Sequence, residues 1–433
     1  MAEIKPIRAW RYNPELTKDI ESLTSPLFDV VSEKQRKKLY QNPFNSIHLS
    51  VPRGTTEEAN NLLNRWKAEG VVIQDNLPAI YVYYQYFKLA GSPREYCRKG
   101  FVCHIRTYDW DEDVILRHEN TIPKAVNDRV ELLERTQLHA SATHGLYTDE
   151  QHQLEKLMDE ALLSPIYETE DYQGVRDVLA VIHDAVAIRK FMDVIRDKKI
   201  ILADGHHRYE GSLLLKHKMQ RNNPNHTGKE GYNFHLMYLT NTESDDLRIL
   251  PTHRLINGLK NLDEHTILKK LEDDFIIKPV EDADTLNEII LGKPWAFGLM
   301  FPESNYKVRL KPEALSKMPW PFPEEVKRLD LTVMHYFIIE KALGIAGKDQ
   351  RHSEQIRFDR SFSDCLQKVL KGEAQLAIIT NEVSIEDVKK VCASGATMPQ
   401  KSTYFYPKVI CGFLFSSIRE DEFRTPEYSP FKN

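Results

Sequence analysis

Residues 200–210 read IILADGHHRYE and mark a point where a buried strand passes into a helix. The apolar run 200–203 predicts a short strand, and Gly205 permits the tight turn that follows it. The first turn of a helix presents unpaired N–H groups and the positive end of a dipole, which favour an anion such as phosphate. A strand, a glycine turn and a helix in this order predict an α/β architecture with a binding site at the turn.

The turn also concentrates side chains that suit phosphate chemistry. Arg208 offers a planar fork of N–H donors, and His206 and His207 can donate hydrogen bonds or carry protons near neutral pH. Asp204 is open to three interpretations: a general base, a magnesium ligand, or a residue that shapes the turn. The alternative to a phosphate site is an ordinary strand-to-helix turn with a surface histidine pair, because Asp-Gly is first of all a turn signal.

Strand and helix patterns alternate along the rest of the chain. We predict strands over 4–10, 45–51, 79–89, 101–105, 234–240, 295–301, 376–380 and 410–415, and helices over 32–40, 56–69, 128–140, 150–163, 184–197, 262–275, 331–343 and 386–393. This mixed order indicates an α/β or α+β fold. We place a boundary near residue 250, between a phosphate-binding region of residues 1–250 and a C-terminal α/β region of residues 251–433.

Composition narrows the class of protein. The chain has 433 residues, and 59 Lys and Arg against 64 Asp and Glu give a formal net charge of −5. This mildly acidic balance lacks the basic footprint of a nucleic-acid binder. No apolar run is long enough to span a bilayer, and the N-terminus has no secretory signal pattern. We therefore expect a cytoplasmic protein with neither a nucleic-acid nor a membrane partner. A local basic pocket for a small phosphorylated substrate is still allowed, because net charge averages over the whole surface.

The cysteines point to a reducing compartment. They are odd in number, widely spaced and without a C-x-x-C pair, at positions Cys97, Cys103, Cys365, Cys392 and Cys411. This pattern indicates neither a disulfide framework nor a thiolate zinc site, so we expect reduced and mostly buried thiols. Walker A and G-x-G-x-x-G patterns are also missing from the sequence, which argues against P-loop and Rossmann folds.

Two further groups of polar residues in the first half of the chain are candidate site residues. His118-Glu119-Asn120-Thr121 offers an imidazole, a carboxylate and a hydroxyl, and Glu119 could bind an ammonium group or magnesium. The alternative is a polar loop before a helix. Asp29 precedes the helix that Ser32 is expected to cap. It could serve as a general base or as a second cap for that helix.

The second half of the chain adds two more candidates. Lys401, Ser402 and Thr403 lie before an aromatic run, where their side chains and backbone N–H groups suit a phosphate or carboxylate. The alternative is a β-turn with a solvated lysine. Arg254 could clamp a carboxylate with two hydrogen bonds, or form a structural ion pair.

The string 203–210 (ADGHHRYE) resembles the nucleotide-phosphate motif of the ParB/sulfiredoxin-like superfamily. That superfamily includes sulfiredoxins, partition-protein nucleotide domains and an archaeal free-serine kinase. The resemblance implies a ParB/sulfiredoxin-like core in which His207 and Arg208 hold nucleotide phosphates. His206 stands where sulfiredoxins carry their nucleophilic cysteine, so the resemblance argues against sulfinic-acid repair.

The chain as a whole resembles one family, catalogued as domain of unknown function 1015. The matching stretches are 7–9 (IRA), 25–32 (SPLFDVVS), 42–43 (NP), 118–121 (HENT), 128–129 (DR), 251–255 (PTHRL) and 398–408 (MPQKSTYFYPK). Residues 25–28 depart from the more usual Ala-Pro-Pro-Tyr of the family. The resemblance implies a link to serine biosynthesis and to O-phosphoserine.

Together these features predict a phosphoryl-transfer enzyme acting on serine or O-phosphoserine, as a kinase or as a phosphatase, with Mg²⁺ and ADP or ATP as candidate cofactors. The predicted catalytic residues are Asp204, His206, Asp29 and Glu119. The predicted phosphate-binding residues are Gly205, His207 and Arg208, and the predicted substrate-binding residues are His118, Arg254, Lys401, Ser402 and Thr403. The alternative function is a nucleotide-binding regulatory switch of the ParB-like class without serine chemistry.

Overall fold

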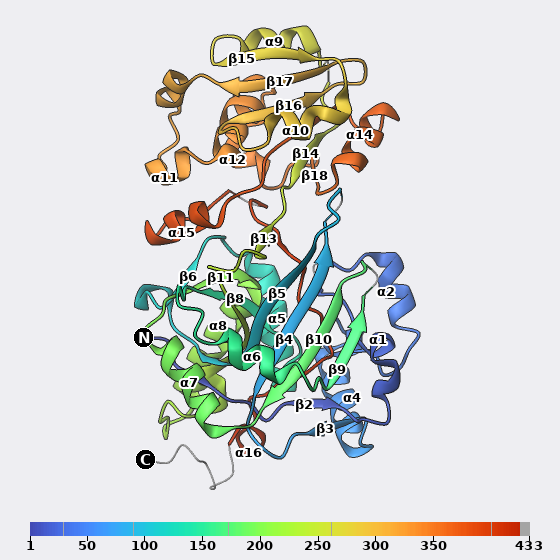
Figure 1. Cartoon of the computed structure of the whole chain (residues 1–433), viewed down its shortest axis with the longest axis vertical. Helices are drawn as coiled ribbons and strands as arrows, with labels where there is room; N and C mark the ends of the chain where they lie inside the picture. The colour runs from blue at the N-terminus through green and yellow to red at the C-terminus, as the bar shows by residue number, and fades with distance from the viewer. Residues whose placement is uncertain (29, 90, 172, 261, 400, 425–433) are drawn as a thin grey trace. The chain divides into compact units, whose positions relative to one another are not determined.

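The computed structural model describes residues 1–424 apart from positions 29, 90, 172, 261 and 400. The chain divides into two compact units (Figure 1). Unit 1 contains Met1–Leu247 and the segment that starts at Pro407, and unit 2 contains Arg248–Tyr406. The predicted boundary near residue 250 lies beside this division. The predicted C-terminal region 251–433 is wrong in its extent, because the chain returns to unit 1 at Pro407.

Unit 1 is built on a mixed sheet with the strand order β6-β11-β8-β12-β5-β4-β10-β9, and β1 also pairs with β5. Among the described residues these strands are β1 (Ile4–Lys5), β4 (Ile80–Lys88), β5 (Glu95–Arg106), β6 (Ile115–Arg117), β8 (Thr143–Tyr147), β9 (Tyr167–Glu170), β10 (Arg176–Ile182), β11 (Ile200–Asp204) and β12 (Phe234–Asn241). The helices are α1 (Ile20–Leu23), α2 (Glu33–Leu39), α3 (Ile47–Ser50), α4 (Thr56–Ala68), α5 (Pro123–Thr136), α6 (Glu155–Ala161), α7 (Ala185–Arg196), α8 (His206–Asn222) and α16 (Glu420–Phe423).

Both faces of this sheet are covered, so its central strands are apolar on both sides. In β4, Ile80, Val82 and Tyr84 belong to the core cluster that also contains residues of α6, α7 and α8. Tyr81 and Tyr83 belong to the cluster on the other face, with residues of α3 and α4. Helices on both faces of a mixed sheet confirm the predicted α/β class.

The segment after Pro407 joins unit 1 by pairing with its earlier parts. Trp10 forms a β-bridge with Phe415, and Ser25 forms one with Cys411. The short strand β21 (Ser416–Ser417) pairs with β7 (Leu138–His139). A continuous strand over 410–415 was predicted from its apolar residues, and this prediction is wrong. Residues 410–415 make only isolated bridges with the described residues, and Gly412, with φ of 106°, interrupts the extended backbone between them.

Residues 45–51 are also not the strand that their alternating pattern predicts. Residues Ile47–Ser50 form the short helix α3. Asn45 starts the turn, since its Oδ1 accepts a hydrogen bond from the Ile47 N–H at 2.9 Å. An Asn side chain that bonds its own backbone two residues on favours a turn over a strand.

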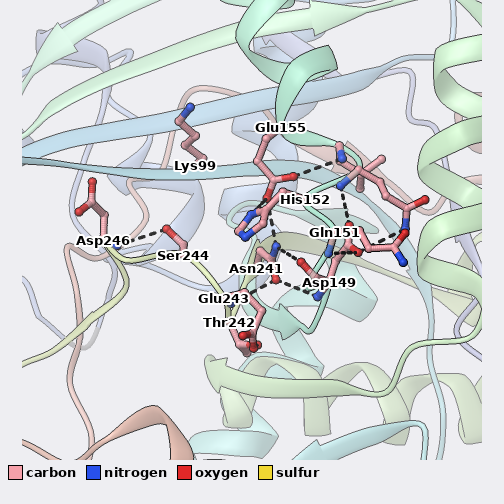
Figure 2. Close-up of polar contacts among 12 residues, drawn as sticks. Lys99, Asp149, Gln151, His152, Glu155, Asn241, Thr242, Glu243, Ser244 and Asp246 are labelled. Carbon is pink, nitrogen blue, oxygen red and sulfur yellow. Dashed lines mark hydrogen bonds and ion pairs between the residues drawn. The ribbon is translucent and has the colours of Figure 1, made fainter.

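Hydrogen bonds between Asn241, the last residue of β12, and Asp149, two residues after β8, join the ends of these strands (Figure 2). Asn241 Nδ2 donates to the carbonyl oxygen of Asp149 at 2.8 Å, and Asn241 Oδ1 accepts from the Asp149 N–H at 2.9 Å. Asn241 also donates to Glu155 at 3.1 Å. These bonds extend the parallel pairing that places His144 beside Tyr238.

Unit 2 has a sheet of its own, in the order β15-β17-β16-β19-β14-β18. Its strands are β14 (His253–Ile256), β15 (Phe275–Val280), β16 (Ala296–Met300), β17 (Asn305–Leu310), β18 (Ile356–Asp359) and β19 (Leu376–Ile379), and a separate pair joins β13 (Arg248–Ile249) to β20 (Phe405–Tyr406). Its helices include α9 (Glu264–Leu271), α10 (Leu286–Ile290), α12 (Asp330–Val333), a π-helix over Met334–Ala342, α14 (Phe362–Leu370) and α15 (Ile385–Ala393). This is the second α/β region that the sequence predicts.

The cysteines are reduced, and all except the half-buried Cys97 are buried. Within the described part of the chain, no helix is both long and apolar enough to cross a membrane.

Replacement of Thr55 by alanine should weaken α4. Thr55 caps this helix by accepting from the Glu58 N–H, and Glu58 accepts from the Thr55 N–H in return. We expect Thr55→Ala to lower the free energy of unfolding by about 1 kcal/mol in urea titrations. The neighbouring Thr56→Ala is the control, because Thr56 makes only an exposed bond to Glu131. Equal losses in both variants would contradict the capping role.

Candidate functional site

The strand-to-helix turn forms as predicted and requires a glycine. β11 ends at Asp204, Gly205 has φ of 92°, and α8 starts at His206 and continues for 17 residues. A Cβ atom at position 205 would lie 2.5 Å from Thr143 Cγ2 and 2.8 Å from Arg208 Nη2. Both the left-handed backbone and the lack of space exclude a larger residue. The backbone therefore passes close to β8, and no side chain caps the N-terminus of α8 among the described residues.

Asp204 lies between two cations at this turn. Its Oδ2 accepts from Arg208 Nη2 at 3.0 Å, and its Oδ1 accepts from Lys408 Nζ. Burial alone would raise the pKa of Asp204, but the charges of Lys408 and Arg208 outweigh it and hold the pKa well below its ordinary value. Asp204 is therefore ionised at neutral pH and positions two cations.

A magnesium role for Asp204 stays a prediction. Each oxygen of its carboxylate is already bound to a cation. Over residues 1–424 as described, no group of three His, Cys, Asp or Glu side chains is arranged to hold a metal ion.

Arg208 is anchored on several sides. Its Nη1 donates to the carbonyl oxygen of Ala142 at 2.7 Å and to Ser141 Oγ at 3.0 Å. Its Nε is buried and has no hydrogen-bond partner among the described residues. Arg208 also lines a small cavity of about 50 Å³, together with Arg129 and Ser141. The guanidinium is thus held in a fixed position, and its Nε–H is a buried donor that has no acceptor among the described residues.

The predicted loop 118–121 packs against the turn. The rings of His118 and His206 are 4.8 Å apart at an angle of 84°, and His206 Nδ1 lies 4.0 Å from Glu119 Oε2. The N–H of Ile122 donates to His207 Nε2 at 3.0 Å. The structure therefore brings together candidate residues that are more than 80 positions apart in the chain.

Both buried imidazoles at the site are neutral at pH 7. Burial lowers the pKa of His118 to about 4 and lowers that of His206 well below its ordinary value. His206 is 4% exposed, and its Nε2 has no hydrogen-bond partner among the described residues. A neutral imidazole can accept a proton or donate a hydrogen bond to a ligand.

Charged groups of both signs gather at the turn. Lys408 and Arg208 bind the carboxylate of Asp204, and the carboxylate of Glu119 lies 4.0 Å from His206 Nδ1. The N-terminus of α8 adds roughly half a positive charge. The helix terminus and the partly satisfied guanidinium of Arg208 suit an anionic ligand.

Lys408 was not singled out as a site residue by sequence reasoning, although it closes the matched stretch 398–408. It lies 204 positions from Asp204. A lysine after a proline carries no local signal of such a contact.

The other predicted residues belong to unit 2, apart from Asp29, which lies outside the described residues. Arg254 is buried, and its Nη2 lies 3.1 Å from His335 Nε2 and 3.5 Å from the carbonyl oxygen of Lys401. Burial lowers the pKa of Arg254 to about 9. Ser402 Oγ donates to the carbonyl oxygen of Pro399. Arg254 thus lies beside the predicted 401–403 loop, and the substrate-binding role of these residues stays a prediction.

Removal of the Asp204 charge should destabilise unit 1. We expect Asp204→Asn to lower the free energy of unfolding at pH 7 by about 3 kcal/mol, because Lys408 and Arg208 lose their shared counter-charge while mostly buried. The control is Asp193→Asn, which removes an exposed ion pair with Arg196 on α7. That variant should lose less than about 1 kcal/mol. Similar losses from the two variants in urea unfolding would contradict the role of Asp204.

No protein with a curated description matches this sequence. Solved structures that match this chain include free serine kinase in complex with AMP, at 12% identity over 75% of this chain and 93% of that chain, with a TM-score of 0.37. A mutant free serine kinase in complex with ADP matches at 11% identity over 75% and 94% of the two chains, with a TM-score of 0.37. A conserved hypothetical protein from Pyrococcus furiosus matches at 12% identity over 74% and 97%, with a TM-score of 0.36.

A family model described as "Protein of unknown function (DUF1015)" matches residues 4–332, which is most of the chain. The protein therefore belongs to the DUF1015 family.

Proposed function

We propose that this protein is a phosphoryl-transfer enzyme that interconverts O-phosphoserine and serine, with the phosphate bound at the N-terminus of α8. One observation carries the proposal: Lys408 and Arg208 converge on Asp204 beside the N-terminus of a 17-residue helix. A phosphate group there would interact with both cations and with the positive end of the helix dipole. The family resemblance of the 203–210 string supports phosphate as the anion and serine as the other reactant.

The cations supply what phosphoryl transfer needs most, which is stabilisation of negative charge on the phosphoryl oxygens. The bond between phosphorus and the serine oxygen breaks, and a new bond forms from phosphorus to an oxygen of ADP or of water. The departing serine oxygen takes up one proton. With ADP the products are serine and ATP, and with water they are serine and inorganic phosphate.

His206 is the residue best placed to accept a proton, from the attacking water in hydrolysis or from the serine hydroxyl in the reverse transfer from ATP. In hydrolysis it then returns this proton to the departing serine oxygen. Its Nε2 is buried and without a partner among the described residues, its imidazole is neutral, and it begins the helix at which the phosphate is proposed to bind. The carboxylate of Glu119 lies 4.0 Å from the other ring nitrogen, where its charge would stabilise the protonated ring.

The test is to incubate the pure protein with O-phosphoserine, with and without ADP and magnesium, and to assay serine, phosphate and ATP. We expect serine to appear in at least one condition. His206→Asn should lower kcat by about 100-fold, because general acid–base catalysis contributes that much or more. His217→Asn is the matched control on α8, since His217 is exposed and pairs with Asp109. It should leave kcat within about threefold of the wild type, because it lies outside the site.

Two outcomes would overturn the proposal. The first is a lack of turnover in every condition, together with tight nucleotide binding, which would instead indicate a nucleotide-binding switch. The second is equal kcat in the His206 and His217 variants.

A further inference from the structure

A second set of buried charged groups lies in the middle of the unit 1 sheet, on three neighbouring strands. Arg98 of β5 is the direct partner of Gln85 of β4, and Gln85 is the direct partner of Asp177 of β10. Arg98 is 1% exposed, and the other two side chains are fully buried. Directly paired residues point to the same face of a sheet, so these three side chains form one row.

Gln85 occupies the middle of this row and contacts both of its neighbours. Its Oε1 accepts from Arg98 Nη2, and its Nε2 donates to Asp177 Oδ1 at 2.8 Å. Tyr83 also donates to Asp177 Oδ1. Among the described residues, Arg98 and Asp177 form no direct ion pair within the usual 4 Å. The row therefore separates the Arg98 guanidinium from the Asp177 carboxyl by one amide. Burial raises the pKa of this carboxyl to about 7, so an ammonium group bound beside it would favour its ionised form.

Several atoms of the row are buried and unsatisfied. Nε and Nη1 of Arg98 have no hydrogen-bond partner among the described residues, and neither has Oδ2 of Asp177. Nε and Nη1 carry three of the five N–H groups of a guanidinium. Buried polar atoms without partners cost stability, and a charged group costs more. Such a pair is therefore expected to have a ligand with complementary charges.

The row is connected to the phosphate turn through one residue. The carbonyl oxygen of Lys408 accepts from Gln85 Nε2 at 3.0 Å. The side-chain Nζ of the same lysine donates to Asp204. The next contact along the same segment is the Ile410 N–H, which donates to the Tyr83 hydroxyl at 3.4 Å. One short segment thus spans from the turn to the row.

We propose that Arg98 and Asp177 form the subsite for the carboxylate and ammonium groups of a free α-amino acid, which rests on the proposed phosphoryl transfer at the turn. Arg98 binds the carboxylate through its unsatisfied N–H groups, and Asp177 Oδ2 accepts from the ammonium group. An α-amino acid carries both charges on neighbouring carbon atoms, so it satisfies both residues at once. A substrate with only one of the two groups leaves the other residue unpaired.

The subsite is tested by calorimetry with L-serine, ethanolamine and glycerate. Ethanolamine lacks the carboxylate of serine, and glycerate replaces its ammonium group by a hydroxyl. We expect the wild type to bind serine about 100-fold more tightly than either analogue, because each analogue leaves a buried charge unpaired. Equal binding of the three compounds, or no binding of serine at saturating phosphate, would overturn the inference and indicate that the row holds internal water only.

Arg98→Met should weaken serine binding by about 100-fold while binding of inorganic phosphate stays within threefold. Lys99→Met is the matched control, because Lys99 is the next residue of β5, points to the opposite face and pairs with the half-exposed Asp159. Should Arg98→Met fail to fold, Arg98→Lys keeps the charge but loses the planar fork and should weaken serine binding by about tenfold. Wild-type affinity for serine in a folded Arg98 variant would overturn the subsite.

The same measurements separate the two proposals. Arg98-dependent serine binding without any turnover of O-phosphoserine would overturn the proposed function and keep the subsite. Turnover that is equally fast with O-phosphoethanolamine and O-phosphoserine would keep phosphoryl transfer and overturn the subsite.

Discussion

The mostly buried carboxylate of Asp204, held between Lys408 and Arg208, is the interaction on which the site depends. A buried charge is costly unless it is paired and hydrogen-bonded, and here one carboxylate serves two cations. These two ion pairs hold together the end of β11, the first turn of α8 and the segment after Pro407. They also place two cations beside the N-terminus of α8. The contacts that stabilise unit 1 therefore also fix the two cations to which the proposed anion would bind.

Two polar regions of very different composition lie on unit 1, and Lys408 touches both. The turn carries two cations beside the N-terminus of a helix, and phosphate is the ligand proposed there. The row Arg98–Gln85–Asp177 has one basic and one acidic group, and several of its atoms have no hydrogen-bond partner among the described residues. A phosphorylated amino acid carries a group for each region. The two proposals therefore assign the two regions to different ends of one small molecule.

Local signals in the sequence predict the local structure well. Ser32 and Gln35 form the capping box that their spacing predicts, and the 200–210 stretch forms the strand, glycine turn and helix in the predicted order. The strand predicted over 45–51 is wrong. Three alternating apolar residues are compatible both with a short strand and with a single helical turn that packs against a core. The sequence does not predict Lys408 as a site residue, because its partner Asp204 lies 204 positions away. It does not predict the Arg98–Asp177 row either, because these residues are neighbours only through the order of strands in the sheet. No spacing rule within a sequence contains that information.

The return of the chain to unit 1 at Pro407 has a consequence for synthesis. A ribosome makes about 5 to 20 residues per second, so Lys408 follows Asp204 after about 10 to 40 s. The turn and α8 are translated early in that interval, and all of unit 2 must be translated before Lys408 is added. The proposed anion site is therefore among the last parts of the molecule to be completed. A prematurely terminated chain that ends within unit 2 retains the glycine turn but lacks the lysine on which the charge balance of the site depends.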